Sequence, residues 1–125
     1  SPGMNFFEVN EGISKDQSFI NIEGTKFDIP KQLEESNGSK NFFGIRPENL
    51  TLSNSEGLKG SVFGLEYLGS RKIITVKTSF GEIKVKTDIS VNVKLSENVQ
   101  VKPLNNNIII FDGETDKSLN SEFIK

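Results

Sequence analysis

Residues 74–86 read ITVKTSFGEIKVK, in which apolar and polar side chains alternate on both sides of the Phe80-Gly81 pair. Alternation with a period of two places every second side chain on the same face of a β-strand. Two such runs joined by a short turn that contains glycine predict a β-hairpin. Its apolar members are expected to face the core and its lysines the solvent: Ile74, Val76, Ile83 and Val85 inside, and Lys77, Lys84 and Lys86 outside.

Short alternating runs recur along the chain and are separated by clusters of Gly, Asn, Ser and Asp. Many short strands with frequent turn signals are typical of a sandwich or barrel. We therefore predict an all-β fold, a barrel or sandwich of short, mostly antiparallel strands. Further strands are expected at 6–9 and 19–22, as a first pair, at 26–29, 91–95 and 99–101, and at 108–111, where an unbroken apolar run predicts deeper burial.

The length of 125 residues suits one domain with a substantial core, and we expect residues 1–125 to form a single domain. Residues 31–41 are polar and rich in turn formers, which predicts a loop without core residues and with one helical turn around Leu33. Residues 116–125 are expected to form a C-terminal tail. Residues 1–3 are interpreted as a linker, with an expression remnant as the alternative.

Composition argues against several classes of function. The chain has no cysteine and no histidine, so it lacks a disulfide framework, the usual zinc ligands and the usual general base. The net charge of −2 gives no overall positive field for a phosphate backbone, so no nucleic-acid partner is expected. No apolar run approaches the roughly 20 residues that cross a bilayer, and we expect a soluble, cytoplasmic domain.

Known catalytic signatures are also missing. The sequence contains neither a Gly-x-x-x-x-Gly-Lys-Ser/Thr phosphate loop nor a Gly-x-Ser-x-Gly elbow. Its carboxylates and serines are scattered, with no histidine to activate them. We expect no catalytic residue and no cofactor bound to this chain.

The segment Gly44 to Leu50 reads GIRPENL and predicts a strand that ends at a corner. Pro47 biases Arg46 toward extended backbone and has the φ angle of a tight turn. Glu48 would then lie in the first turn, where exposed N–H groups favour a carboxylate, and Arg46 would pair with a carboxylate across the corner. These residues hold the corner in shape or, alternatively, contact a partner.

The segment Leu65 to Ser70 reads LEYLGS and follows Phe63 and Gly64. Phe63, Leu65 and Tyr67 are expected to share one face of a strand. The structural interpretation is that Gly69 supplies a turn while Tyr67 covers the core with its hydroxyl at the surface. The alternative is a protein interface, because tyrosine is enriched at interface anchors.

The segment Phe111 to Asp116 predicts a turn, since Asp tolerates a left-handed backbone better than most residues. Asp112, Glu114 and Asp116 alternate as in a calcium loop. The sixth and twelfth positions of such a loop would be Lys117 and Phe123, which are not the required Gly and Glu. No metal site is expected.

Together these motifs resemble the C-terminal accessory domain, called TOBE, of the ATP-binding subunits of sugar-import (maltose-type) ABC transporters. The resemblance implies an OB-like barrel or sandwich. The resemblance rests on 44–50 and 65–70, on SPGMNFF at 1–7 and on FDGET at 111–115, and so spans nearly the whole chain. Gly-Ile-Arg-Pro-Glu matches the family motif residue for residue. The chain departs from the family at Asn49, where His is often found, and at Asp116, where Gly is usual.

The resemblance implies a non-catalytic regulatory and dimerisation domain, and a chain that is a fragment of a longer ATPase. The parent subunit would be a homodimer on the inner face of the membrane and would import carbohydrate or a related small solute. Its partners would be the upstream ATPase domain, which would bind ATP and Mg, the transmembrane subunits and regulatory proteins. The possible interface residues are Arg46, Pro47, Glu48, Glu66, Tyr67, Gly69 and Asp112.

Two other functions stay open. One is a free-standing OB-type module that binds a small ligand or single-stranded nucleic acid through Lys77, Lys84, Lys86 and some of the ten phenylalanines. Against it, lysines in an alternating strand form an ordinary solvated face, and most phenylalanines are expected in the core. The other is an inert, monomeric structural fragment.

Overall fold

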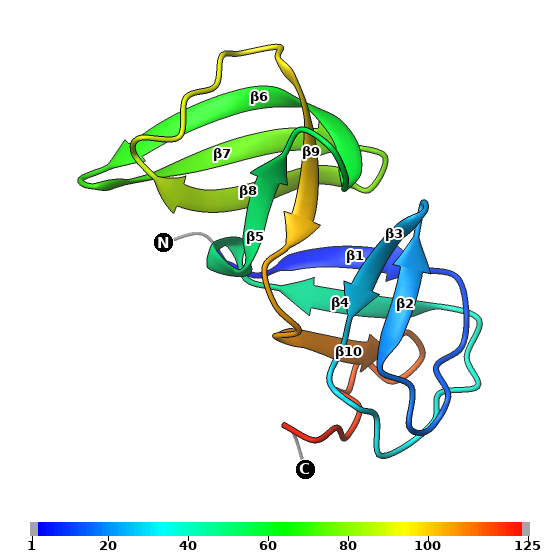
Figure 1. The fold of residues 1–125 in the computed structure, drawn as a ribbon. Helices are drawn as coiled ribbons and strands as arrows, with labels where there is room; N and C mark the ends of the chain where they lie inside the picture. Colours follow the sequence, from blue (N-terminus) through cyan, green and yellow to red (C-terminus); the bar gives the residue numbers. More distant parts are fainter. Residues whose placement is uncertain (1–2, 124–125) are drawn as a thin grey trace.

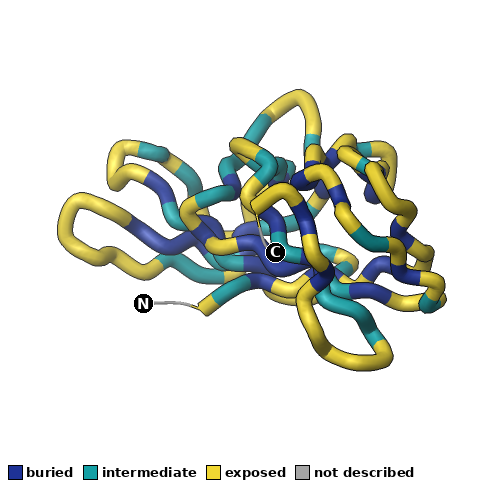
Figure 2. The backbone as a smooth tube through the Cα atoms, turned by 90° about the horizontal axis from the view of Figure 1, so that it is seen from below, coloured by how far each residue is buried: buried dark blue, intermediate teal, exposed yellow. Residues whose placement is uncertain are grey.

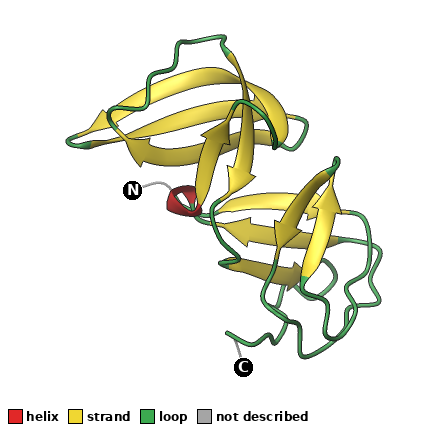
Figure 3. Ribbon diagram, viewed as in Figure 1, coloured by secondary structure: helices red, strands yellow, loops and turns green. Residues whose placement is uncertain are grey.

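The computed structural model describes residues 3–123, and its regular structure consists of antiparallel β-strands with one short 3-10 helix (Figures 1 and 3). The predicted all-β class is confirmed. The elements are β1 Asn5–Val9, β2 Phe19–Ile22, β3 Thr25–Asp28, β4 Asn41–Ile45, η1 Pro47–Asn49, β5 Leu50–Ser53, β6 Leu58–Leu68, β7 Arg71–Thr78, β8 Gly81–Asp88, β9 Asn98–Pro103 and β10 Ile108–Asp112.

A five-stranded sheet in the order β5-β9-β6-β7-β8 forms the larger part of the molecule. The predicted hairpin is confirmed as β7 and β8, which pair from Arg71 opposite Asp88 to Thr78 opposite Gly81. Its four predicted core residues are buried; Lys77 is exposed, and Lys84 and Lys86 are half-buried. The outer strands β5 and β8 contact each other, so the sheet curls toward a barrel.

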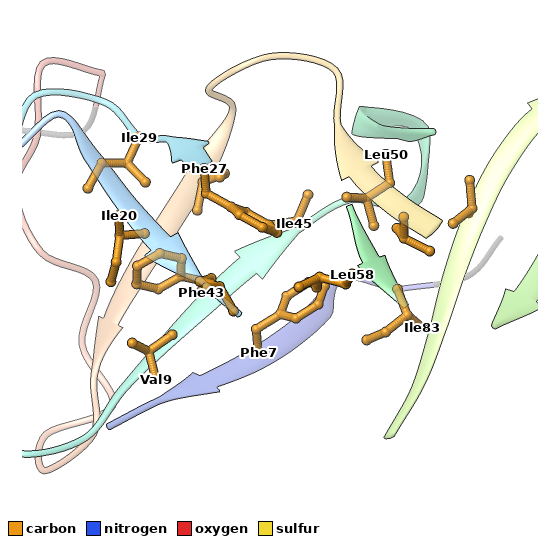
Figure 4. Packing of buried hydrophobic residues seen from close by; sticks show 14 of the residues in the cluster. Phe7, Val9, Ile20, Phe27, Ile29, Phe43, Ile45, Leu50, Leu58 and Ile83 are labelled. Atoms are coloured by element: carbon orange, nitrogen blue, oxygen red, sulfur yellow. The ribbon is translucent and has the colours of Figure 1, made fainter. Parts of the chain in front are cut away.

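The smaller part consists of the sheet β1-β4-β10 and the hairpin β2–β3 (Figure 1). Strand β4 is central and pairs antiparallel with both neighbours. Ile20 and Phe27 of the hairpin are directed toward Phe43 of β4, and the Phe7 and Phe27 rings meet edge to face at 6.1 Å (Figure 4). The hairpin therefore covers one face of this sheet.

One hydrophobic cluster joins the two parts. It includes Phe7 and Phe43 from the smaller part and Leu58, Ile83 and Val101 from the larger part. Burying one such side chain contributes about 1.5–3 kcal/mol, so the cluster accounts for the packing of the parts against each other. Along the backbone, buried residues concentrate in the interior of the molecule and exposed residues in its outlying segments (Figure 2).

The predicted first pair of strands is wrong. Residues 19–22 pair with β3, and β1 pairs with β4. Glu23 and Gly24 both have positive φ, as in a type I′ turn, and this two-residue turn makes β2 and β3 a local hairpin.

The polar loop at 31–41 contains no helix, so the helical turn predicted around Leu33 is also wrong. The Leu33 N–H donates instead to the carbonyl of Asn120, and isolated bridges join Gln32 to Ser121 and Ser36 to Ile13. Residues 116–123 are thus tied to this loop, and Leu119 among them belongs to the core. Residues 1, 2, 124 and 125 of the predicted linker and tail lie outside the described residues.

Residues 91–95 do not form the predicted strand. Turns closed by Val91 N–H to Asp88 and by Glu97 N–H to Lys94 interrupt the ladder, and Leu95 is exposed. Residues 108–111 do form a strand, but only alternate side chains are deeply buried, because Ile109 faces away from the core. Burial on one face suffices for an antiparallel edge strand.

Phenylalanines are less buried than predicted. Phe7, Phe27 and Phe43 are fully buried, whereas four others expose about half of their surface or more. Those four are Phe6, Phe19, Phe63 and Phe123.

Candidate functional site

The GIRPENL segment forms the predicted corner between β4 and β5. Arg46 is extended, with φ −71° and ψ 147°, and Pro47 begins η1 and is buried. The Asn49 N–H donates to the Arg46 carbonyl at 2.9 Å, which closes the turn. Proline is favoured at this position because its fixed φ suits the first helical residue.

Asn49 hydrogen-bonds this corner to the connector between β9 and β10. It stands at the position where the family often has His. Its carbonyl accepts the Leu104 N–H at 2.9 Å, and its side-chain oxygen accepts from the Asn105 amide at 3.1 Å. The side chain therefore has a structural partner within the chain.

Arg46 and Glu48 project from the corner into solvent. Neither makes an ion pair within residues 3–123, so the carboxylate partner expected for Arg46 is absent there. The two charges are available for contact with another molecule.

The second motif lies at the end of the long β6–β7 hairpin. Gly69 has φ +62° at the first position of a two-residue turn, as predicted, while Ser70 has an ordinary φ, which together match a type II′ turn. Tyr67 is 62% exposed, its ring lies 5.6 Å from the Lys72 ammonium, and Leu68 is 41% exposed. Tyr67 therefore does not cover the core but lies on a projecting hairpin.

A β-bulge between Val62 and Gly64 changes which side chains share a face of β6. Phe63 lies beside Lys77, whereas Leu65 and Tyr67 pair with Ile74 and Lys72. Lys77 and Ile74 are an odd number of residues apart on β7 and point to opposite faces. The prediction that Phe63, Leu65 and Tyr67 share a face is therefore wrong, because the bulge inserts one residue.

The third motif is a tight turn after β10. Asp112 accepts the N–H groups of Glu114 and Thr115 at 2.8 and 3.1 Å through Oδ1, and the Ser36 hydroxyl at 3.2 Å through Oδ2. The two backbone hydrogen bonds lower the pKa of Asp112 below its ordinary value. Asp116 has φ 60°, so it adopts the left-handed backbone as predicted.

The three motifs do not form a single site. Asp112 pairs with Asn41 at the start of β4, whereas the corner follows Ile45 at its other end. The β6–β7 turn lies at the far side of the five-stranded sheet from β10 (Figure 1). If the motifs contact partners, they do so as separate surfaces.

A polar groove of about 1080 Å³ runs between the two parts, and the sequence did not reveal it. The β2–β3 hairpin, the β5–β6 turn and the β9–β10 connector line it. Two ion pairs lie on its walls: Lys26 with Asp28 within β3 at 3.7 Å, and Lys102 of β9 with Glu56 of the β5–β6 turn at 2.9 Å. Three segments distant in the sequence meet here, which no local pattern indicates.

Within residues 3–123, no group of three or more Asp, Glu, His or Cys side chains is arranged to hold a metal ion. The one described helix, η1, is far too short and polar to cross a membrane.

The family profile of the TOBE domain matches residues 43–107. This range contains both the corner motif and the β6–β7 hairpin, and it covers just over half of the chain.

A curated relative aligns over nearly the entire chain. It is the osmoprotective compounds uptake ATP-binding protein GgtA of Synechocystis sp. The two sequences are 26% identical over an alignment 128 residues long, which covers 95% of this chain and 35% of the relative. The chain thus spans about a third of the length of this relative.

Among solved structures, the cytoplasmic molybdate-binding protein ModG with molybdate bound superposes with a TM-score of 0.60. The match covers 86% of this chain and 95% of the other, at 14% sequence identity. This similarity confirms the predicted OB-like fold.

Proposed function

This chain belongs to the TOBE domain family, and we propose that it is the non-catalytic accessory domain of the ATP-binding subunit of an ABC importer. The observation that carries the proposal is the alignment of 95% of the chain with only 35% of an uptake ATP-binding protein. A domain-sized match to a larger ATPase fits a module attached to a separate catalytic part. The parent ATPase domain would supply the phosphate loop and would bind ATP and Mg.

The transported solute is proposed to be a carbohydrate or a related small osmolyte. The resemblance of the motifs to sugar importers supports a carbohydrate. The name of the Synechocystis relative supports a small protective solute. The substrate would pass through the membrane subunits, so no residue of this domain is assigned to it.

The proposed role of the domain is to hold two ATP-binding subunits together. A contact between accessory domains keeps the attached ATPase domains at a high effective concentration while they separate and reassociate. Regulatory proteins that bind the same domains would shift the population between separated and closed arrangements.

The β6–β7 hairpin is the surface we assign to this contact. Beyond the bulge, residues 64–68 of β6 pair with β7 only, so the other edge of the strand is open. Tyr67 and Leu68 are exposed on this projecting segment. Tyrosine beside an open strand edge provides both apolar area and main-chain hydrogen-bonding groups for a partner.

Sedimentation of the chain over a wide concentration range tests this role. We expect reversible dimers that weaken when both Tyr67→Ser and Leu68→Ser are introduced. Phe19→Ser provides a matched control, because Phe19 is also an exposed aromatic residue beside a lysine but lies on β2. A wild-type chain that stays monomeric throughout, or dimers that only Phe19→Ser weakens, would contradict the assigned contact.

A further inference from the structure

A second, smaller groove lies on the outer face of the five-stranded sheet. Its volume is about 560 Å³, within the range of small-ligand sites. Lys59 and Ser61 of β6 lie there opposite Gln100 and Asn98 of β9, and Lys77 of β7 lies opposite Ser61. These side chains alternate with core residues on the same strands, so they point away from the core.

The groove is positively charged although the chain as a whole is acidic. Lys59 and Lys77 are the charged members of its nine lining residues, and none of the nine is acidic. Neither lysine makes an ion pair within residues 3–123, and Glu82, opposite Lys77 on β8, lies beyond ion-pair distance. Two uncompensated ammonium groups in one concave site favour a dianion over a neutral ligand.

Neutral hydrogen-bonding groups surround the two lysines. Asn98 and Gln100 make no side-chain hydrogen bonds within the part of the chain that the structure describes, so their Nδ2 and Nε2 groups are available as donors. The Gln100 Oε1 atom, which is buried without a partner, is an acceptor and does not contribute to binding a phosphate. Ser53 and Ser61 add hydroxyl groups to the lining. Lysine, amide and hydroxyl donors together match the several acceptor oxygens of a phosphate group.

An aromatic ring adjoins the charged groove. Phe63 is 58% exposed, and the Lys77 ammonium lies 5.7 Å from its ring centre. The bulge after Val62 places Phe63 on the Lys77 side of the sheet. A ligand whose phosphate reaches Lys77 would therefore bring its organic part next to an exposed apolar ring.

We propose that this groove binds the phosphate group of a small phosphorylated molecule that also carries a ring. Lys59 and Lys77 neutralise the phosphate, the neighbouring amides and hydroxyls donate hydrogen bonds to it, and Phe63 packs against the ring. Lys59, Ser61 and Lys77 lie at the end of the β6–β7 hairpin away from Tyr67 and Leu68, so the domain can respond to a metabolite without losing its proposed contact at the turn.

Titration of the chain with adenosine 5′-monophosphate, followed by amide NMR shifts at low salt, tests the proposal. Inorganic phosphate and adenosine are titrated separately as controls, because each carries only one part of the monophosphate. We expect saturable shifts around residues 53–54, 59–61 and 98–100, with the monophosphate binding more tightly than either half. Lys59→Gln combined with Lys77→Gln should weaken its binding about tenfold or more, since charge-assisted hydrogen bonds to phosphate are lost.

Two further variants separate the site from general surface charge. Lys84→Gln with Lys86→Gln removes the same net charge from the same sheet face outside the groove and should leave binding unchanged. Phe63→Ser should weaken the monophosphate but not inorganic phosphate.

Three results would overturn the proposal. The first is the absence of saturable shifts, and the second is binding that survives the change of Lys59 and Lys77. The third is an oligothymidylate that binds far more tightly than the monophosphate with a steep salt dependence, which would identify a single-strand nucleic-acid surface instead.

Discussion

The side-chain amide of Asn5 forms two hydrogen bonds with the backbone of Lys84, 79 positions later. It thereby occupies both main-chain groups of Lys84, as a neighbouring strand would. Asn5 Oδ1 accepts the Lys84 N–H at 2.9 Å, and Asn5 Nδ2 donates to the Lys84 carbonyl at 2.8 Å. Asn5 is 8% exposed and belongs to β1, whereas Lys84 lies on the edge strand β8. One side chain thus closes part of a sheet edge and links the two parts of the fold.

Asn5→Ala should lower the free energy of unfolding by about 1–3 kcal/mol, because a partly buried N–H and carbonyl lose their partners. Urea denaturation measures the change. Asn21→Ala, at an exposed position on β2, is the control and should change stability little. Equal effects of the two substitutions would show that the Asn5–Lys84 pair contributes nothing.

Phe43→Ala should destabilise the chain by about 3–5 kcal/mol, because Phe43 is fully buried where the hairpin β2–β3 covers β4. Phe6→Ala, on the neighbouring strand but 53% exposed, should cost far less. Thermal unfolding of both variants tests whether the shared cluster is the core. Similar losses of melting temperature would contradict that assignment.

Stability should depend on the Asp112 carboxylate in acid. The pKa of Asp112 is lowered in the folded state from its ordinary value of 3.8, so ionised Asp112 stabilises the fold above that pH. This contribution is lost as the pH falls from about 4 through the lower, folded pKa. Asp88, whose pKa is lowered by hydrogen bonds from Ser90, contributes in the same direction.

Asp112→Asn should therefore reduce stability at neutral pH and flatten the acid limb of a plot of melting temperature against pH. Asp28→Asn makes the same change of charge at a surface ion pair and controls for net charge. An Asp112→Asn profile parallel to that of the unmodified chain would exclude a role for the Asp112 turn.

Substitutions of Asp116 test the backbone conformation of the same turn without changing the charge at Asp112. Its φ of 60° lies in the left-handed region, which glycine adopts without strain. Asp116→Gly should be neutral or stabilising, whereas Asp116→Val should cost about 1–2 kcal/mol. A valine variant as stable as the glycine variant would show that the turn relaxes to another conformation.

Local patterns predicted the parts of the fold that local chemistry determines. The alternation in 74–86 predicted β7 and β8, Pro47 predicted the corner, and Gly69 predicted the turn of the β6–β7 hairpin. Each of these depends on residues within a few positions of one another, where periodicity and backbone preference act directly.

The sequence did not predict features that depend on distant segments. The pairing of β1 with β4 spans some thirty residues of loop and hairpin, and the bulge beside Phe63 depends on which β7 residue faces it. The proposed phosphate-binding groove is formed by Lys59, Lys77 and Gln100 from three different strands. Only the register brings these together, so the sequence showed Lys77 merely as part of a solvated face.

The intact mass and full sequence of the native polypeptide that carries this domain test the account most directly. Purification from the source cells with an antibody against the chain, followed by mass spectrometry, gives both. We predict a polypeptide about three times longer, with a phosphate loop upstream of this domain, in keeping with the 35% of the relative that the chain covers. A native polypeptide that consists of this domain alone would contradict the assignment to an importer ATPase.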